Sequence, residues 1–385
     1  RRTMPHYWTR RNLAEPEDKA LAFAHSFLGI RLQCAQCHKH PFAPWTQDDF
    51  KQFAAFFEPV RYGVAPQTDQ RYRQLATKVG MNLRGDQGAA VRVDLLKRAG
   101  DDKLVPWREL YIADRDKSRS LSLLRSGTVD IAPHEDPRSV IMEWMKQPDH
   151  PWFARSLVNR VWASYFGVGI IDPPDDLSPA NPPSNPALLE GLTRGFVANH
   201  YDLKWLHRQI TASDTYQRSW KPNQTNRHDD RHFSRAIPRR IPAEVLYDAL
   251  KQVTASSNQL SDVRGDLTRR AIGHLSMRMA GTYAMHVFGK PERAVNCDCE
   301  RVNQPTLLQS IFLQNDPLVS QRLADSGWID EIAQREPSDP QLDHGELVNQ
   351  AWLRALGRLP IDREKDRALA HLAGVESVPE AMRDL

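Results

Sequence analysis

The sequence has only four cysteines among its 385 residues, and it has no apolar run long enough to cross a membrane. It also lacks a dense block of lysine or arginine, because 52 basic and 48 acidic residues leave a net charge of only +4. Dispersed arginine is typical of an ion-paired surface, so we expect no nucleic-acid partner. The opening stretch RRTMPHYWTRRN has neither an initiator methionine nor a signal peptide, and we therefore expect a fragment or a processed product.

Helical patterns cover most of the chain, and the sequence predicts a mainly α fold. Residues 15–29 begin acidic and end at Gly29, and Thr46 is placed to cap a second helix whose phenylalanine stripe we expect in the core. From about 60 to 135, short apolar runs such as VRVDLL and LVPWRELYI lie among Gly, Asp and Arg, which indicates a small mixed or β insertion. Asp136 and Pro137 then begin a larger helical domain. The predicted division is 1–60, 61–135 and 136–385, with later helices at about 187–199, 203–213, 242–255, 306–325, 345–356 and 361–373.

Cys34, Cys37 and His38 have the C-x-x-C-H spacing at which c-type haem is attached. In that arrangement both thiols bond to the haem vinyl groups and the histidine supplies an axial nitrogen to the iron. The spacing suits this chemistry because both sulfurs must reach one edge of the porphyrin while the imidazole turns beneath its face. Chance occurrence is rare with so few cysteines, so a cofactor or redox role is favoured.

A second close pair, Cys297 and Cys299 in NCDCER, leaves other interpretations open. Four thiolates, or three with His38, can hold zinc or iron if folding brings the two segments together. Disulfides or inert buried thiols are a further alternative. A thioredoxin-like dithiol is weaker, because the first pair lies between two predicted helices and not in a βαβ pattern.

The remaining candidates are weaker. His40 can support the ligands of the C-x-x-C-H motif, or it can simply take part in a turn with Pro41 and Phe42. Asp175 and Asp176, in a proline-rich loop, can be an acid pair, calcium ligands or helix caps. Candidates for a second axial haem ligand are His25, His274, Met277, Met279, Met285 and His286. No hydrolase, zinc-protease, Walker or dinucleotide-binding pattern is present, so no catalytic residue is predicted.

Several long stretches together resemble a known pair of domains. FLGIRLQCAQCHKHPFAPWTQDDFKQFAAFF resembles the cytochrome-like domain of unknown function of large planctomycete proteins. PWFARSLVNRVWASYFGVGIIDPPDDL, RRIPAEVLYDAL, FGKPERAVNCDCERVNQPTLLQSIFLQND and AWLRALGRLP resemble the companion planctomycete domain usually joined to it. The resemblance covers roughly residues 1–60 and 136–375.

This resemblance places both cysteine motifs in the pattern of the family. The C-x-x-C-H motif corresponds to Cys34, Cys37 and His38, and the C-x-C-E-R motif corresponds to Cys297, Cys299, Glu300 and Arg301, the last two as possible supports for the ligands. It also implies export to the periplasm or the exterior, and a further cytochrome-like domain elsewhere in the full-length protein. We therefore expect a c-type haem protein that transfers electrons to an unknown partner or forms part of an oxidoreductase. The alternative is a binding or assembly protein with a zinc or iron site, or with disulfides, formed by the two cysteine pairs.

Overall fold

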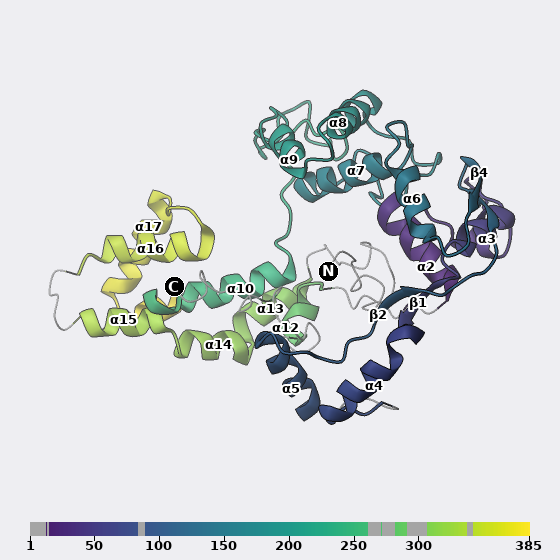
Figure 1. Ribbon diagram of the computed structural model, residues 1–385. Coiled ribbons are helices and arrows are strands. Elements are labelled where there is room, and N and C mark those ends of the chain that lie inside the picture. Colours follow the sequence, from purple (N-terminus) through teal and green to yellow (C-terminus); the bar gives the residue numbers. More distant parts are fainter. Residues whose placement is uncertain are drawn as a thin grey trace. The chain divides into compact units, whose positions relative to one another are not determined.

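The N- and C-terminal parts of the chain fold as separate units in the computed structural model. The structure describes residues 13, 15–83, 89–260, 271, 282–290, 306–336 and 342–385. Contacts divide the chain into Arg1–Pro238 and Arg239–Leu385. Helices dominate both units, and two small antiparallel sheets accompany them, so the mainly α prediction is confirmed (Figure 1). The predicted division into domains 1–60, 61–135 and 136–385 is a different kind of division from these two contact-based units, and it stays a prediction.

The first unit contains all of the described strands. Its helices are α2 (Pro16–Phe23), α3 (Gln47–Ala55), α4 (Asp69–Lys78), α5 (Ala89–Gly100), α6 (Pro137–Met145), α7 (Phe153–Phe166), α8 (Pro186–Ala198) and α9 (Leu203–Thr211). Shorter turns are the π-helical η1 (Ala24–Leu28) and the 3₁₀ turns η2 (Gln33–Gln36) and η3 (Pro66–Thr68). The strands are β1 (Val60–Gly63), β2 (Glu109–Ile112), β3 (Arg119–Leu123) and β4 (Gly127–Ile131).

Local signals in the sequence define several helix ends, and those at Thr46 and Asp136 are as predicted. Thr46 caps α3 through a capping box, because its hydroxyl accepts the backbone N–H of Asp49 while the Asp49 carboxylate accepts the N–H of Thr46. Asp136 caps α6 through a single bond, in which its carboxylate accepts the backbone N–H of Arg138. Gly167 ends α7 in the left-handed conformation, with φ of 79°, which glycine adopts without strain.

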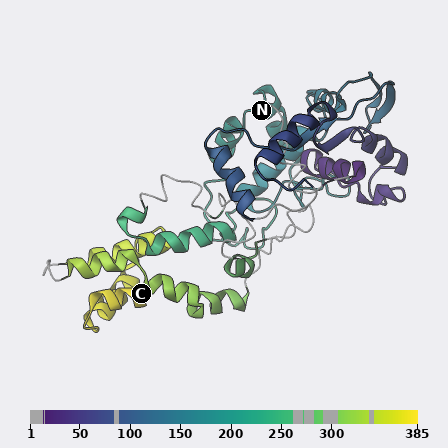
Figure 2. The ribbon, with the colours of Figure 1, turned by 60° about the horizontal axis from the view of Figure 1, so that its bottom comes forward.

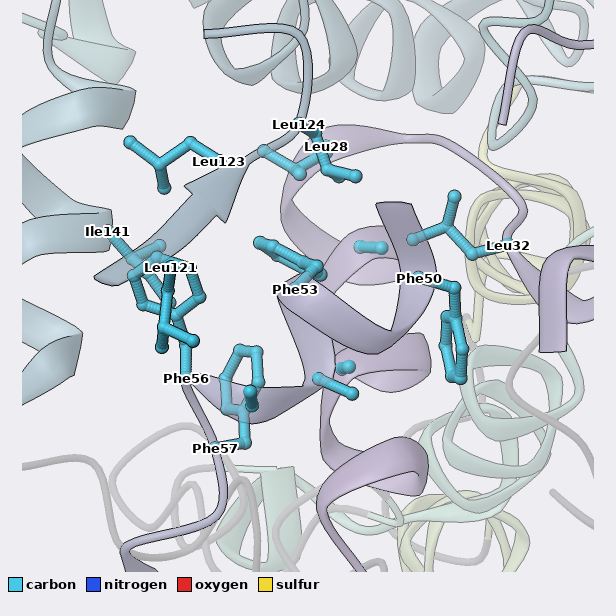
Figure 3. Close-up of a cluster of buried hydrophobic side chains, with 14 of the residues drawn as sticks. Leu28, Leu32, Phe50, Phe53, Phe56, Phe57, Leu121, Leu123, Leu124 and Ile141 are labelled. Atoms are coloured by element: carbon cyan, nitrogen blue, oxygen red, sulfur yellow. The ribbon is translucent and has the colours of Figure 1, made fainter. Parts of the chain in front are cut away.

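The phenylalanine stripe of α3 lies in the hydrophobic core, as expected. Phe53 and Phe56 have no exposed surface and Phe57 is 1% exposed. Figure 3 shows these rings beside leucines of η1 and β3, and Ile141 of α6 belongs to the same cluster. Burial of one such ring contributes about 1.5–3 kcal/mol to folding. The same core therefore holds together the N-terminal segment, the second sheet and the start of the helical domain.

The insertion between 60 and 135 is only partly β. β1 pairs with β2 from Val60 opposite Ile112, and β3 and β4 form a hairpin that closes at Leu123 opposite Gly127. VRVDLL, interpreted as one of the short runs of a strand-containing or irregular insertion, instead lies inside helix α5. Its pattern is ambiguous because a short apolar run fits either a strand or one face of a helix.

All regular secondary structure in the described residues of the second unit is helical. Its helices are α10 (Ala243–Thr254), α12 (Thr282–Val287), α13 (Leu307–Asn315), α14 (Pro317–Ala324), α15 (Gly327–Arg335), α16 (His344–Leu356), α17 (Asp362–Ala373) and α18 (Val378–Asp384). The yellow C-terminal helices pack beside the green ones of this unit in Figure 2. The single helix predicted over 306–325 is two helices, because Asp316 ends the first and caps the second at Pro317.

Candidate functional site

The C-x-x-C-H motif lies on a short 3₁₀ turn between η1 and α3. Gly29 ends η1 with φ of 63°, which lets the chain leave the helix sharply. Leu32, before the turn, is 1% exposed, and Ala35, inside it, has no exposed surface. The turn is therefore anchored to the core through these two apolar side chains, and its other residues face away from the core.

Both thiols of the motif are free and exposed. Cys34 and Cys37 form no disulfide. Residues three apart in a 3₁₀ turn lie one above the other, so their side chains leave the turn on the same side. The backbone N–H groups of Cys37 and His38 both donate to the carbonyl of Cys34, at 3.3 and 3.2 Å, which closes the turn. The local fold thus presents the two sulfurs together to solvent, as attachment to one ligand edge requires.

His38 keeps one ring nitrogen available for a ligand. Its Nδ1 lies 2.7 Å from the carbonyl oxygen of Lys39, an acceptor, so Nδ1 carries the proton and donates. Nε2 is then the unprotonated nitrogen with its lone pair free. Metal-binding histidines are usually fixed by such a bond from the other ring nitrogen to a carbonyl. The exposed imidazole of His38 therefore has the tautomer that an axial ligand needs.

His40 takes part in the loop that follows the motif. Its Nδ1 accepts the backbone N–H of Phe42 at 3.1 Å, and its own N–H donates to the carbonyl of Trp45 at 2.8 Å. The half-buried ring of His40 lines a small pocket with Trp45. Phe42 projects outward with 72% of its surface exposed. A role for His40 in supporting the ligands stays a prediction.

The second cysteine motif cannot be placed beside the first. Cys297, Cys299, Glu300 and Arg301 lie outside the described residues, so both shared-site alternatives stay predictions. His274, Met277 and Met279 lie outside them as well. Within the ranges that the structure describes, no three His, Cys, Asp or Glu side chains gather as the ligands of a metal ion, and this includes Cys34, Cys37 and His38.

A buried charged cluster formed by His25, Arg31 and Asp175 was not anticipated. Asp175, 2% exposed, lies 2.7 Å from Nε2 of His25 and 2.9 Å from a guanidinium nitrogen of Arg31. Burial alone would raise the pKa of the Asp175 carboxyl, but the hydrogen bond with His25 and the charge of Arg31 outweigh it and hold that pKa well below its usual range. The carboxylate is therefore ionised and fully engaged.

This cluster changes two interpretations of single residues. Asp175 is neither a helix cap nor an open calcium ligand, because His25 and Arg31 occupy its oxygens. His25 is 6% exposed and its Nε2 is taken, so it is not available as a second axial ligand. About 150 residues separate His25 from Asp175. The only signal in the sequence is the aspartate pair in a proline-rich loop, and that pattern does not indicate which residues bind the aspartates.

The same loop and helix α7 both donate hydrogen bonds to backbone carbonyls of the N-terminal segment. Leu177 N–H donates to the carbonyl of Gly29 at 2.7 Å, and Arg160 donates to the carbonyl of His25 at 2.6 Å. An added Cβ on Gly29 would lie 2.6 Å from Oγ of Ser156 and 2.8 Å from the Leu177 side chain. This close approach fixes where η1 ends and hence where the motif turn begins.

The exposed motif is suited to a haem attached covalently at the surface, and not to a haem enclosed in a pocket. Two free thiols and an open imidazole nitrogen are the donor set of c-type attachment. The pocket beside the motif has a volume of about 60 Å³, far below the few hundred Å³ of a typical cofactor pocket. A haem attached at these exposed thiols would therefore not be enclosed in this pocket.

Comparison with known families supports the resemblance found in the motifs. Residues 5–62 match the family described as PSCyt2, a protein of unknown function (DUF1549), and residues 137–372 match PSD1, a protein of unknown function (DUF1553). No curated protein and no solved structure matches the chain. No helix of the described ranges is long and apolar enough to cross a membrane. Since the second match covers more than half of the sequence, the chain belongs to the PSD1 family of proteins of unknown function.

Proposed function

We propose that Cys34, Cys37 and His38 attach a c-type haem and that the chain transfers electrons outside the cytoplasm. The observation that carries the proposal is the joint exposure, on one turn, of two free thiols and an imidazole whose Nε2 is open. The location and the participation of other cytochrome-like domains come from the family resemblance and are part of the proposal. The redox partner, within the same full-length protein or outside it, is part of the proposal too.

The atoms and electrons of the attachment step balance with the two thiols and the haem vinyl groups alone. Each S–H adds across a vinyl C=C, so one C–S bond forms and the hydrogen passes to the other vinyl carbon, with no oxidant. Exposure of Cys34 and Cys37 on one side of the turn permits both additions without rearrangement of the core. The haem, when bound, supplies one-electron redox chemistry.

The chain's own residues then hold the imidazole in place. The bond from Nδ1 of His38 to the Lys39 carbonyl fixes the ring's rotation and leaves Nε2 as the unprotonated nitrogen. Gln47 Nε2 donates to the carbonyl of Gln36 at 3.0 Å, which ties the turn to the first residue of α3. The turn that carries the motif is therefore held by α3, a helix whose first residues are fixed by a capping box.

A visible spectrum tests the proposal directly. The full chain is produced in a host with c-type haem maturation and purified, and the haem is extracted with acid acetone. We expect a Soret band that stays with the protein after extraction. Cys34→Ala with Cys37→Ala removes covalent haem. His38→Ala keeps the thioether bonds but changes the band positions, because an axial ligand is lost.

Variants of the second motif separate the proposal from its alternative. Cys297→Ser with Cys299→Ser leaves haem attachment unchanged if the first motif acts alone. A colourless wild-type protein with about one zinc or iron per chain, lost in that double variant, supports instead a shared metal site. A colourless, metal-free protein with disulfides between the two pairs supports a structural role. Either result overturns haem attachment.

A further inference from the structure

The pocket beside the motif is built from three distant parts of the first unit. His40 and Trp45 come from the loop after the motif, Arg125 comes from the turn between β3 and β4, and Trp152 and Asp176 come from the helical domain. The rings of Trp45 and Trp152 meet edge to face with their centres 5.5 Å apart. The pocket thus has aromatic walls with a few polar side chains, which is the usual composition of a small-molecule site.

Of the two arginines that line this pocket, one has no partner in the described residues. Arg31 also lines the pocket, but it is engaged with Asp175 at 2.9 Å and faces Asp176 at 3.8 Å. The single charge of Arg31 is thus shared between two carboxylates, and it offsets Asp176 only in part. The guanidinium of Arg125 has no hydrogen-bond or ion-pair partner in the described part of the chain. An anion placed at Arg125 therefore gains an interaction without breaking one.

His40, which lines the same pocket as Arg125, supplies a second hydrogen-bond donor. Because its Nδ1 accepts the N–H of Phe42, the proton of the neutral ring lies on Nε2. A carboxylate accepts hydrogen bonds from a guanidinium and an imidazole N–H at once, and such charge-assisted bonds are the stronger ones. The available 60 Å³ corresponds to only a few water molecules, so the pocket admits a short chain and not a large ring.

We propose that this pocket binds an alkyl carboxylate, with the carboxylate at Arg125 and His40 and the short alkyl chain between Trp45 and Trp152. Two sources share this chemistry. One is a free short-chain carboxylate. The other is the propionate side chain of a haem held at Cys34 and Cys37, and only this second source rests on the proposed function.

The first arm of the test uses the full chain made without haem maturation. Sodium propionate is titrated at constant ionic strength, and tryptophan fluorescence is followed because Trp45 and Trp152 line the pocket. We expect a saturable change in the millimolar range, and none with neutral propionamide. Arg125→Gln weakens binding about tenfold or more, since it removes a charge-assisted contact, and Arg125→Lys restores part of it.

Arg71→Gln is the matched control. Arg71 is exposed on α4, has no partner in the part of the unit that the structure describes, and lies outside the pocket lining. It should bind propionate as the wild type does, and all variants should keep the wild-type unfolding temperature. A non-saturating response of the wild type, or equal dissociation constants for wild type and Arg125→Gln, overturns the proposal.

The second arm repeats the titration on haem-loaded protein. Loss of propionate binding assigns the pocket to the haem's own side chain, and retained binding assigns it to a free carboxylate; both support the site. If no haem is attached at all, the proposed function fails, while the first arm still decides the pocket by itself.

Discussion

Protonation of one buried histidine should make the first unit sensitive to mild acid. His150 is 8% exposed, and its ring lies edge-on against Trp144 with the ring centres 4.4 Å apart. Nδ1 accepts the backbone N–H groups of Trp152 and Phe153, at 3.3 and 3.1 Å, at the start of α7. A proton on Nδ1 would point at these two N–H donors, so protonation of His150 breaks both hydrogen bonds at the start of α7.

Burial lowers the pKa of His150 from 6.5 to about 4, and the nearby charge of Asp149 opposes this only in part. Between these two pH values the unfolded chain binds a proton that the folded chain does not, so stability falls as the pH falls. The contribution of neutral His150 to the free energy of unfolding is fully present above about pH 6.5. Linkage gives a loss of about 2.5 kcal/mol at about pH 4.5, relative to neutral pH.

His150→Asn isolates this effect, because the Asn oxygen can accept the same N–H groups but does not titrate. Urea unfolding of wild type and variant is followed by tryptophan fluorescence from about pH 7.5 to pH 4.5, so that other titrating groups cancel in the difference. At neutral pH the variant should be less stable by about 1–2 kcal/mol, since ring packing is lost. Towards about pH 4.5 this difference should vanish or reverse. A difference that stays constant with pH would refute the reasoning.

Three further outcomes test the surroundings of the motif. Gly29→Ala should lower the stability by more than about 3 kcal/mol, because it adds a steric clash to the strain of positive φ. Gly80→Ala, with the same sign of φ but open space around the added Cβ, should lower it by about 1 kcal/mol. Thermal unfolding of the two variants compares these losses. Asp175→Asn should lower stability by about 2–4 kcal/mol in urea at neutral pH, and equal stability would contradict its role in the cluster. In haem-free protein, Cys34 and Cys37 should react with iodoacetamide within minutes under native conditions, as peptide mass spectrometry can show; protection of both would contradict their exposure.

The helix ends of this protein were predictable because their signals are local. A capping box depends on residues three apart, so Thr46 identifies the start of α3 without any knowledge of the rest of the chain. The same holds for Asp136 and for the glycine that ends α7. By contrast, VRVDLL has no local signal that separates a strand from a helix, and its packing partners decide in favour of α5.

The chemistry of the motif divides in the same way. Spacing alone identified Cys34, Cys37 and His38 as a set, since attachment geometry follows from residue separation along one turn. Only the tertiary structure shows that both thiols face solvent and that a buried aspartate binds His25 and Arg31. It also shows that Arg125 lines the same small pocket as His40. Ion pairs and pockets join residues about a hundred or more positions apart, and no periodicity in a sequence encodes such distances.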